Sequence, residues 1–303
     1  MRRILAYTVP PEWEGSTVKD FVRRCLGLSS RVLVKQKHLA GGLLRNGEPC
    51  RSVDVLRAGD LLELCLPEET EHYQAVEGPL TVLWESPDYL VVDKPPQMPV
   101  HPSPGHGRDS LLNRVAYYYQ QGGQSPAFRP LYRLDRDTSG IVVVGKHRVA
   151  VSAAQNAKVV YFAVCQGILT GSGTVDAPIG LESGSKIRRC CQEGGVPSVT
   201  HWQALATRVD HTLLQLQLET GRTHQIRVHM AYMGHPLAGD DLYGGSQKRI
   251  SRQALHCGRL TLVCNPLGVD VSLASSFPLD LLEAFPWIAP FSPREERILC
   301  PPV

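Results

Sequence analysis

The chain has 303 residues, of which 43% are hydrophobic and 20% are charged, and its formal net charge is only +3. These values are ordinary for a globular protein of one or two domains with a sizeable core. No apolar run is long enough to span a membrane, and the N-terminus lacks the apolar core of a signal peptide. We therefore expect a cytoplasmic protein that does not bind a membrane.

The cysteine and histidine positions predict neither disulfides nor a metal site. The chain has nine cysteines, an odd number, and none of them forms a Cys-x-x-Cys pair. Cys190 and Cys191 are adjacent, which suits neither chelation nor bridging. His224 and His229 are five residues apart, whereas a helical zinc pair has a spacing of four. We therefore expect a reduced cytosolic protein without a metal.

Residues 1–66 predict a small α/β unit of two helices and a hairpin sheet. The apolar spacing over residues 17–28 indicates a helix, with Thr17 at its start. A second helix is expected next. Asn46-Gly47 is typical of a hairpin turn, and the apolar residues 61–66 then predict the last strand of the unit.

This N-terminal unit is more basic than the chain as a whole. Residues 16–66 carry nine Lys or Arg residues and five Asp or Glu residues, a net charge of +4 in one sixth of the chain. The second predicted helix carries three of these cations, Arg31, Lys35 and Lys37. Such a basic helix indicates a nucleic-acid surface. The alternative is a helix face that is simply solvated, which is the usual role of charge runs.

The remaining chain predicts a linker, a large α+β domain and a short tail. Residues 67–80 are acidic and bounded by Pro and Gly, as expected of a linker. Residues 81–285 alternate short strands with few helices, the clearest of which has helical apolar spacing over residues 111–119. Residues 286–303 are rich in proline and show no periodicity, so no function is assigned to them.

The first candidate site is the polar segment 132–140, with the sequence YRLDRDTSG. It places Asp135 between Arg133 and Arg136 and runs directly into the apolar strand 141–144. A carboxylate between cations at the mouth of a strand suits a site that keeps an acid ionised beside an anionic ligand. The alternative is an ordinary turn, because Asp, Thr, Ser and Gly are common turn residues.

The second candidate site follows a strand over residues 213–218, which alternates with period two. A helix is expected to start at Thr223 and to stop near Gly234. Its apolar stripe would contain Ile226, Met230 and Met233. Arg227 falls on a different stripe, so it can point away from the apolar core and toward the loop before the helix.

Several motifs resemble those of a known family. RLDRDTSG at 133–140 and LETGRTHQIRVHMAYMGHPLAGDDLYGG at 218–245 are similar to the signature motifs of RluA-type pseudouridine synthases. Further similarities lie at residues 83–96, 100–103, 161–167 and 252–256. Together they cover residues 81 to about 285 in the family order.

The resemblance implies an RNA pseudouridine synthase that needs no cofactor. Its catalytic carboxylate would be Asp135, and Arg227 would pair with it. Arg222 is the alternative partner, although it is expected to meet phosphate instead. Tyr161 would stack on the uracil and offer its hydroxyl. The implied fold is α+β, with a catalytic domain on a mixed, largely antiparallel sheet with a central cleft.

The resemblance also implies how RNA would be held. A uridine inside folded RNA must be flipped out of its stack, and Arg133 would fill the gap that it leaves. Arg136 and Lys94 would hold flanking phosphates. The expected partner is ribosomal or transfer RNA, bound by a monomer without a protein partner. The alternative function is that of a non-catalytic relative that docks on structured RNA.

Other features refine this expectation. Residues 1–66 resemble the S-four RNA-binding module, named after a ribosomal protein, so Arg31, Lys35 and Lys37 would contact RNA. Tyr132 stands where the family usually has His, which predicts altered packing with activity retained. The segment between Lys146 and Tyr161 is shorter than the family pattern, which predicts a truncated helix there.

Overall fold

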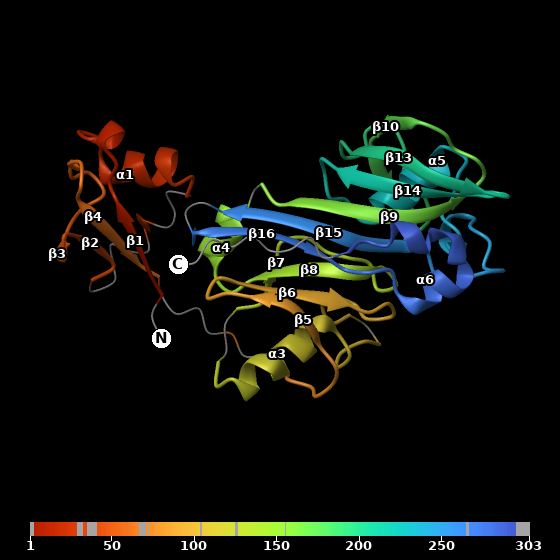
Figure 1. Cartoon of the computed structure of the whole chain (residues 1–303), viewed down its shortest axis with the longest axis horizontal. Coiled ribbons are helices and arrows are strands. Elements are labelled where there is room, and N and C mark those ends of the chain that lie inside the picture. The colour runs from red at the N-terminus through yellow and green to blue at the C-terminus, as the bar shows by residue number, and fades with distance from the viewer. Residues whose placement is uncertain are drawn as a thin grey trace.

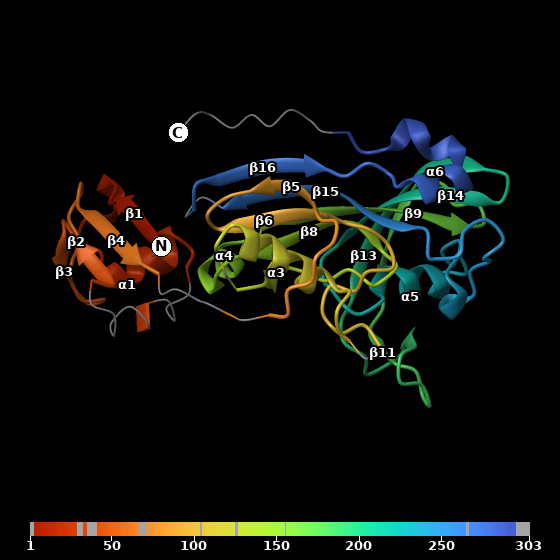
Figure 2. The same ribbon diagram turned by 90° about the horizontal axis from the view of Figure 1, so that it is seen from below.

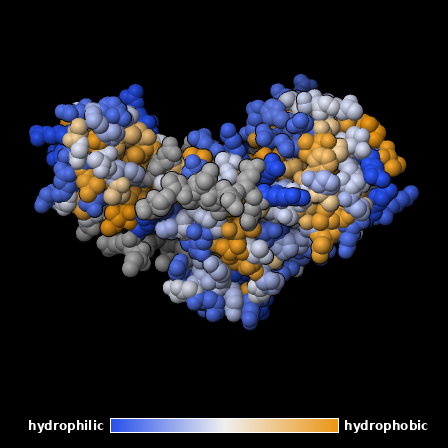
Figure 3. Space-filling model, in the orientation of Figure 1, coloured by the Kyte–Doolittle hydropathy of each residue, from blue (hydrophilic) through white to orange (hydrophobic). Residues whose placement is uncertain are grey.

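The computed structural model of the protein describes residues 3–28, 33–34, 41–66, 71, 73–103, 105–124, 127–154, 156–264 and 267–294. These residues form a small N-terminal lobe and a larger lobe, which lie side by side (Figures 1 and 3). Among the described residues, no helix has both the length and the apolar character needed to cross a bilayer.

The N-terminal lobe is built on a four-stranded sheet with the order β1-β4-β2-β3. Its strands are β1 (Ile4–Thr8), β2 (Leu43–Arg45), β3 (Glu48–Pro49) and β4 (Leu61–Cys65). Asn46 and Gly47 have φ angles of 53° and 83°, so they form the predicted hairpin turn between β2 and β3. Leu62 and Leu64 of β4 are fully buried in the core of the lobe.

The first predicted helix is present and the second lies mostly outside the described residues. A 3-10 turn, η1 (Pro11–Trp13), precedes α1 (Val18–Asp20), which continues into a π-helical segment, η2 (Phe21–Cys25). Thr17 caps α1 as predicted, because its hydroxyl oxygen accepts the backbone N–H of Asp20 at 3.1 Å. Of the second helix, only residues 33–34 are described. The predicted RNA contacts Arg31, Lys35 and Lys37 therefore lie outside the described residues.

The larger lobe contains a ten-stranded sheet whose main path is β10-β13-β14-β9-β15-β8-β6-β5, with β16 beside β15 and β7 beside β8. β8 and β15 are parallel, and the other paired strands are antiparallel. The predicted mixed, largely antiparallel sheet is thus confirmed. Its strands are β5 (Thr81–Glu85), β6 (Tyr89–Lys94), β7 (Arg129–Pro130), β8 (Ser139–Gly145), β9 (Lys158–Gln166), β10 (Ser172–Asp176), β13 (Val199–Arg208), β14 (His211–Leu218), β15 (Leu255–Cys264) and β16 (Val269–Ala274).

Burial explains the apolar runs that the sequence shows. All four residues of the segment 141–144 are fully buried, because β8 lies in the middle of the sheet. A separate hairpin of β11 (Ile179–Leu181) and β12 (Arg189–Cys191) projects from the body of the lobe (Figure 2). The helices are α3 (Leu111–Gln121), α4 (Arg148–Ala153), α5 (Gln225–Tyr232) and α6 (Leu279–Ala284), with 3-10 turns η3 (Asp241–Tyr243) and η5 (Pro286–Phe291). α4 has only six residues, in agreement with the predicted truncation.

The described parts of both predicted boundary segments pack against the larger lobe. Residues 73–80 have no regular structure, but the Asn113 side chain on α3 donates to the carbonyl oxygen of Gln74 at 2.7 Å. At the other end, Ile288 is buried in a cluster that includes Phe162 and Phe277. The packed unit therefore continues beyond residue 285, where the sequence placed its end.

One buried carboxylate joins the two lobes. Arg3, just before β1, donates from Nε and Nη2 to the two oxygens of Asp88 at 3.0 and 2.9 Å. His147 lies 2.8 Å from Asp88 through Nε2. Burial alone raises the pKa of Asp88, but the hydrogen bonds from His147 and Arg3 outweigh it and hold the pKa below its usual value. Asp88 is therefore ionised at neutral pH, and its charge ties the N-terminal lobe to the sheet.

Replacing Asp88 with Asn should loosen this connection. The amide keeps the size of the side chain but removes the charge that holds Arg3, so we expect a loss of about 1–3 kcal/mol of stability at neutral pH. Because the pKa of Asp88 is lowered on folding, this contribution is present above pH ~4 and fades as pH falls further. Chemical denaturation of Asp88→Asn beside the exposed control Asp109→Asn measures it. Equal stability of the two variants would show that Asp88 does not join the lobes.

Candidate active site

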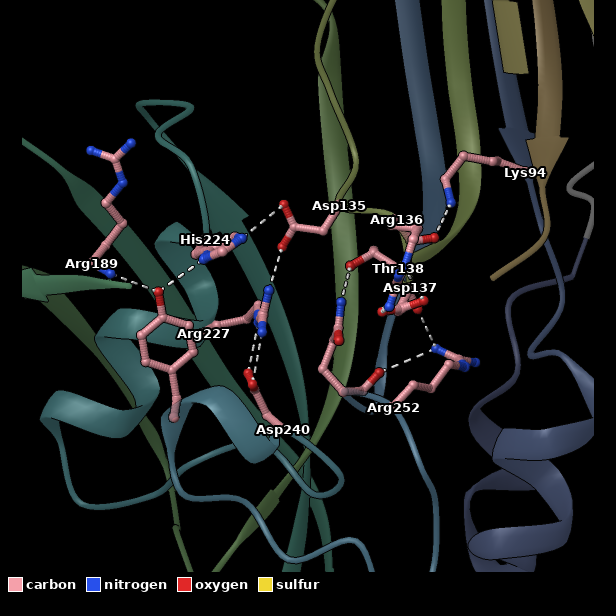
Figure 4. Close-up of polar contacts among 12 residues, drawn as sticks. Lys94, Asp135, Arg136, Asp137, Thr138, Arg189, His224, Arg227, Asp240 and Arg252 are labelled. Atoms are coloured by element: carbon pink, nitrogen blue, oxygen red, sulfur yellow. Dashed lines mark hydrogen bonds and ion pairs between the residues drawn. The ribbon is translucent and has the colours of Figure 1, made fainter. Parts of the chain in front are cut away.

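The three predicted catalytic residues line one cavity over the middle of the sheet. Asp135 lies in the loop before β8, Tyr161 lies on β9, and Arg227 lies on α5. All three line a cavity that also contains Arg133, Arg222 and His224. Residues that are far apart in the sequence thus meet, as the resemblance implied. Figure 4 shows Arg227 and His224 pointing toward the carboxylate of Asp135.

A carboxylate–guanidinium–carboxylate chain forms the centre of the site. Arg227 donates from Nη1 to Oδ2 of Asp135 at 3.1 Å. It also donates from Nε and Nη2 to the two oxygens of Asp240 at 2.7 and 2.8 Å. The side chain of Asp240 is fully buried, and that of Asp135 is 25% exposed. Asp240 therefore fixes Arg227 from behind, while Asp135 remains open to the cavity (Figure 4).

The electrostatics agree with a permanently charged Arg227. Burial by itself lowers the pKa of Arg227, but the hydrogen bonds and charges of Asp240 and Asp135 outweigh it and raise the pKa above its usual value. The ring of Tyr243 adds a cation–π contact at 5.1 Å from the guanidinium carbon. Arg222, the alternative partner for Asp135, is exposed and donates to the carbonyl oxygen of Pro197 instead.

The start of α5 differs from the prediction. The helix begins at Gln225, and the residue before it, His224, has a left-handed backbone with φ 60° and ψ 17°. Thr223 is exposed and does not cap the helix. The side-chain oxygen of Gln225 instead accepts the backbone N–H of Arg222 at 3.0 Å, and its amide donates to the carbonyl oxygen of Val199 on β13. The sequence did not predict this start of the helix, because the hydrogen bond from Gln225 to Val199 involves a strand that is distant in the sequence.

Tyr161 is a buried phenol at the wall of the cavity. Its side chain stands on β9, opposite Cys257 of β15. Burial, with smaller effects from Cys257 and Asp135, raises the pKa of Tyr161 well above its usual value. The hydroxyl is therefore protonated at neutral pH. It can donate a hydrogen bond into the cavity, but it is not ready to act as a base.

Tyr132, which replaces the usual family His, supports the site from inside. Its hydroxyl donates to the carbonyl oxygen of Ile141 at 2.9 Å. The residue also lines a second cavity of about 300 Å³, which Tyr161 shares and which α4 borders through Val151. Tyr132 therefore packs beneath the catalytic loop.

Lys94 does not reach solvent, so its predicted role as a phosphate contact is wrong. Its side chain is fully buried. Nζ donates to the carbonyl oxygens of Pro95, Met98 and Arg136 at 2.9, 2.9 and 3.0 Å. Burial lowers the pKa of Lys94 to about 7, although the charges of Asp137 and Asp135 oppose the shift. Lys94 thus holds the loop that carries Asp135.

A second clamp holds the same loop from the other side. Arg252 is bidentate to Asp280 at 2.6 and 2.9 Å, and its Nη1 donates to the carbonyl oxygen of Asp137 at 3.0 Å. The neighbouring Gln253 donates to the hydroxyl of Thr138 at 3.2 Å. The sequence pointed to segment 252–256 only by resemblance and predicted no contact for it. Lys94 and Arg252 together leave the loop little freedom (Figure 4).

Among the described cations that were predicted to meet RNA, Arg133, Arg136 and Arg222 are at the surface, whereas Lys94 is buried. Arg133 is exposed at the cavity, and so is Arg222. Arg136 is exposed and pairs with the adjacent Asp137 at 2.9 Å. These positions leave each guanidinium accessible to a phosphate. Arg136 would have to share its charge with Asp137.

Asp240 is the residue that sequence reasoning missed. It follows Gly239, whose φ is 78° and whose added Cβ would lie 2.0 Å from the carbonyl oxygen of Arg252. Only glycine fits that turn, which directs Asp240 inward. The segment Gly239-Asp240 was visible in the signature motif. A Gly-Asp pair predicts only a turn, however, and its spacing from Arg227 does not predict an ion pair between Asp240 and Arg227.

The geometry suits a carboxylate that acts on a bound substrate. Arg227 holds one oxygen of Asp135, and Asp135 lines the cavity together with the protonated phenol of Tyr161. Such a carboxylate can form a bond to an electron-poor carbon or carry a proton. The exposed guanidiniums of Arg133 and Arg222 at the same cavity suit an anionic substrate.

The chain is similar in sequence to proteins described as RNA pseudouridine synthases. Residues 88–232 match the family described as RNA pseudouridylate synthase. The chain is 44% identical over 256 residues to YjbO of Bacillus subtilis, an uncharacterised RNA pseudouridine synthase, with coverage of 82% of this chain and 90% of that protein. It is 34% identical over 298 residues to ribosomal large subunit pseudouridine synthase D of Pseudomonas aeruginosa, with coverage of 91% and 93%.

A solved structure supports the same assignment. Human RNA pseudouridylate synthase domain containing 1 is 26% identical, with a TM-score of 0.55 and coverage of 66% of this chain and 84% of that one. The chain shares 44% and 34% identity with the two bacterial synthases over most of the length of each protein. It therefore belongs to the RluA-type family of RNA pseudouridine synthases and is an isomerase.

Proposed function

We propose that this enzyme converts uridines of ribosomal RNA to pseudouridine, with Asp135, Tyr161 and Arg227 as its catalytic residues. The observation that carries the proposal is the pairing of Asp135 with Arg227 in a cavity shared with Tyr161. Ribosomal RNA is favoured over transfer RNA by the name of the relative in Pseudomonas aeruginosa. The alternative, a non-catalytic RNA-binding relative, would have no chemical need for a paired and open carboxylate.

The reaction rearranges one nucleotide without adding or removing a group. The bond between N1 of uracil and C1′ of ribose breaks, a bond between C5 and C1′ forms, and one proton moves from C5 to N1. Asp135 either bonds to the sugar, bonds to the base or carries the proton. In each case Arg227 keeps the negative charge of Asp135 available, and Tyr161 offers a flat ring against the uracil. No cofactor is needed for this balance.

RNA binding would use the exposed cations. Arg133 would fill the gap left by the flipped uridine, and Arg136 and Arg222 would meet phosphates. Residues 1–66 would form an RNA-binding module, in which Arg31, Lys35 and Lys37 add affinity. The catalytic domain would begin near residue 81 and extend through residue 294. A cytoplasmic monomer is part of the same proposal.

Pseudouridine mapping in cells tests the substrate and the carboxylate together. The host gene is deleted and replaced by the wild-type gene or by the variant Asp135→Asn, which keeps the size of the side chain but not its charge. We expect a ribosomal RNA pseudouridine that disappears on deletion, returns with the wild type and stays absent with the variant. RNA affinity should be largely kept, because phosphate contacts supply most of it.

Two results would contradict this proposal. A pseudouridine that depends on the gene but lies in transfer RNA would refute the ribosomal substrate. Normal modification by Asp135→Asn would refute the role of the carboxylate.

Removing the charge of Asp240 should damage both stability and turnover. Asp240→Asn leaves Arg227 buried with only Asp135 as an anionic partner, and truncating such a pair costs about 3–5 kcal/mol. We expect a lower melting temperature and slower turnover with little change in RNA affinity. The matched control is Asp241→Asn, the exposed neighbour. Wild-type turnover by Asp240→Asn would show that Arg227 needs no second carboxylate.

Lys94 and Arg222 should respond oppositely to substitution. Lys94→Met removes three hydrogen bonds from the catalytic loop, so we expect lower stability and an unchanged salt dependence of RNA binding. Arg222→Gln should flatten the log–log salt slope by about 0.7–0.9, the effect of one lost phosphate contact. Binding titrations at several salt concentrations measure both. A flattened slope for Lys94→Met would restore its role as a phosphate contact.

A further inference from the structure

His224 faces the oxygen of Asp135 that Arg227 does not hold. Its Nε2 lies 3.9 Å from Oδ1 of Asp135, whereas Arg227 binds Oδ2. Its left-handed backbone is uncommon for a residue other than glycine, and such conformations concentrate at functional sites. His224 also lines the catalytic cavity. Nothing in the sequence patterns assigned it a function.

Neighbouring groups favour one ring nitrogen of His224 as the carrier of the hydrogen. The backbone N–H of Arg189 on β12 donates to the hydroxyl oxygen of Tyr243 at 3.0 Å. That oxygen lies 2.9 Å from Nδ1 of His224, so the hydroxyl hydrogen of Tyr243 is available to Nδ1. With Nδ1 as an acceptor, the hydrogen of a neutral ring sits on Nε2, the nitrogen that faces Asp135 (Figure 4).

The surroundings also favour the neutral ring. Burial lowers the pKa of His224, and the charge of Arg227 acts in the same direction. Asp135 opposes these effects, but the net shift of the pKa is downward. The groups that face His224 come from four places in the fold: Asp135 before β8, Arg189 on β12, Arg227 on α5, and Asp240 and Tyr243 at η3.

We propose that Tyr243 and His224 form a positioning relay for Asp135, in which Tyr243 donates to Nδ1 and neutral His224 directs Nε2–H at Oδ1. The proposal rests on the proposed role of Asp135 as the catalytic carboxylate. A distance of 3.9 Å is too long for a hydrogen bond, but catalytic contacts often shorten when substrate is bound. Donors on both oxygens would then fix the plane of the carboxylate.

Protonation of His224 should disable the relay. A protonated ring carries hydrogen on both nitrogens, so Nδ1 no longer accepts from Tyr243. The resulting cation beside Oδ1 would compete with Arg227 and with the substrate for the charge of Asp135. We therefore expect the single-turnover rate to fall in acid, with a midpoint below the ordinary pKa of histidine.

The pH profile of two variants tests the relay. The substrate is total RNA from host cells that lack the gene, labelled with tritium at C5 of uridine. Because the isomerisation removes hydrogen from C5, tritium release reports turnover. Single-turnover rates at saturating enzyme are measured over about pH 4.5–8, which spans the histidine range. The controls are His211→Gln and Tyr118→Phe, whose side chains contact Asp210 and Glu85 away from the cavity.

Each variant has a distinct expected profile. Tyr243→Phe keeps the ring beside Arg227 but removes the hydroxyl that stabilises neutral His224, so the acid midpoint should move to higher pH, with a rate about two- to tenfold lower at neutral pH. His224→Gln should abolish the acid midpoint and lower the rate about ten- to hundredfold. The enzyme concentration that gives half of the maximal single-turnover rate should change little in either variant.

Profiles are normalised, so partial misfolding does not alter their midpoints. An acid midpoint unchanged in Tyr243→Phe or retained in His224→Gln would overturn the relay, as would a wild-type rate that is flat throughout the range. If the wild type releases tritium only from RNA other than ribosomal RNA, the proposed substrate is wrong, while the relay is still decided by the same midpoints.

Discussion

The structure of the site depends on one buried guanidinium between two carboxylates. Arg227 spans Asp240, which is fully buried, and Asp135, which opens to the cavity. A buried charge is tolerated only when it is paired and hydrogen-bonded. Asp240 meets that requirement through two bonds, so Arg227 can present its remaining nitrogen to Asp135 without being drawn toward solvent.

The rest of the fold limits the movement of the other partner. Lys94 and Arg252 donate hydrogen bonds to the backbone on the C-terminal side of Asp135, at the carbonyl oxygens of Arg136 and Asp137. Both clamps come from strands or loops that neighbour β8, so the sheet itself sets the position of the carboxylate. The site is thus held by backbone contacts that do not touch the cavity, while the exposed arginines remain available for RNA.

The strands of the sheet and the first helix could be predicted because period-two alternation and helical spacing are local patterns. The pairing of Asp135 with Arg227 was predicted only through the resemblance of the motifs to those of a known family. Sequence reasoning misassigned Lys94, since a lysine beside a charged loop looks the same whether it points to solvent or to three carbonyl oxygens. Thr223 has the chemistry of a helix cap, but Gln225 binds β13 instead. The role of Asp240 depends on the turn at Gly239, and the sequence does not show that this turn places Asp240 against Arg227.

A double-mutant cycle between Asp135 and Asp240 tests the central claim most directly. The free energy of unfolding is measured for the wild type, Asp135→Asn, Asp240→Asn and the double variant. If both carboxylates share Arg227, removing both leaves a buried cation without an anionic partner, so the account predicts a coupling energy of at least about 1 kcal/mol. Additivity within about 0.5 kcal/mol would contradict the account, because it would mean that the two carboxylates act independently.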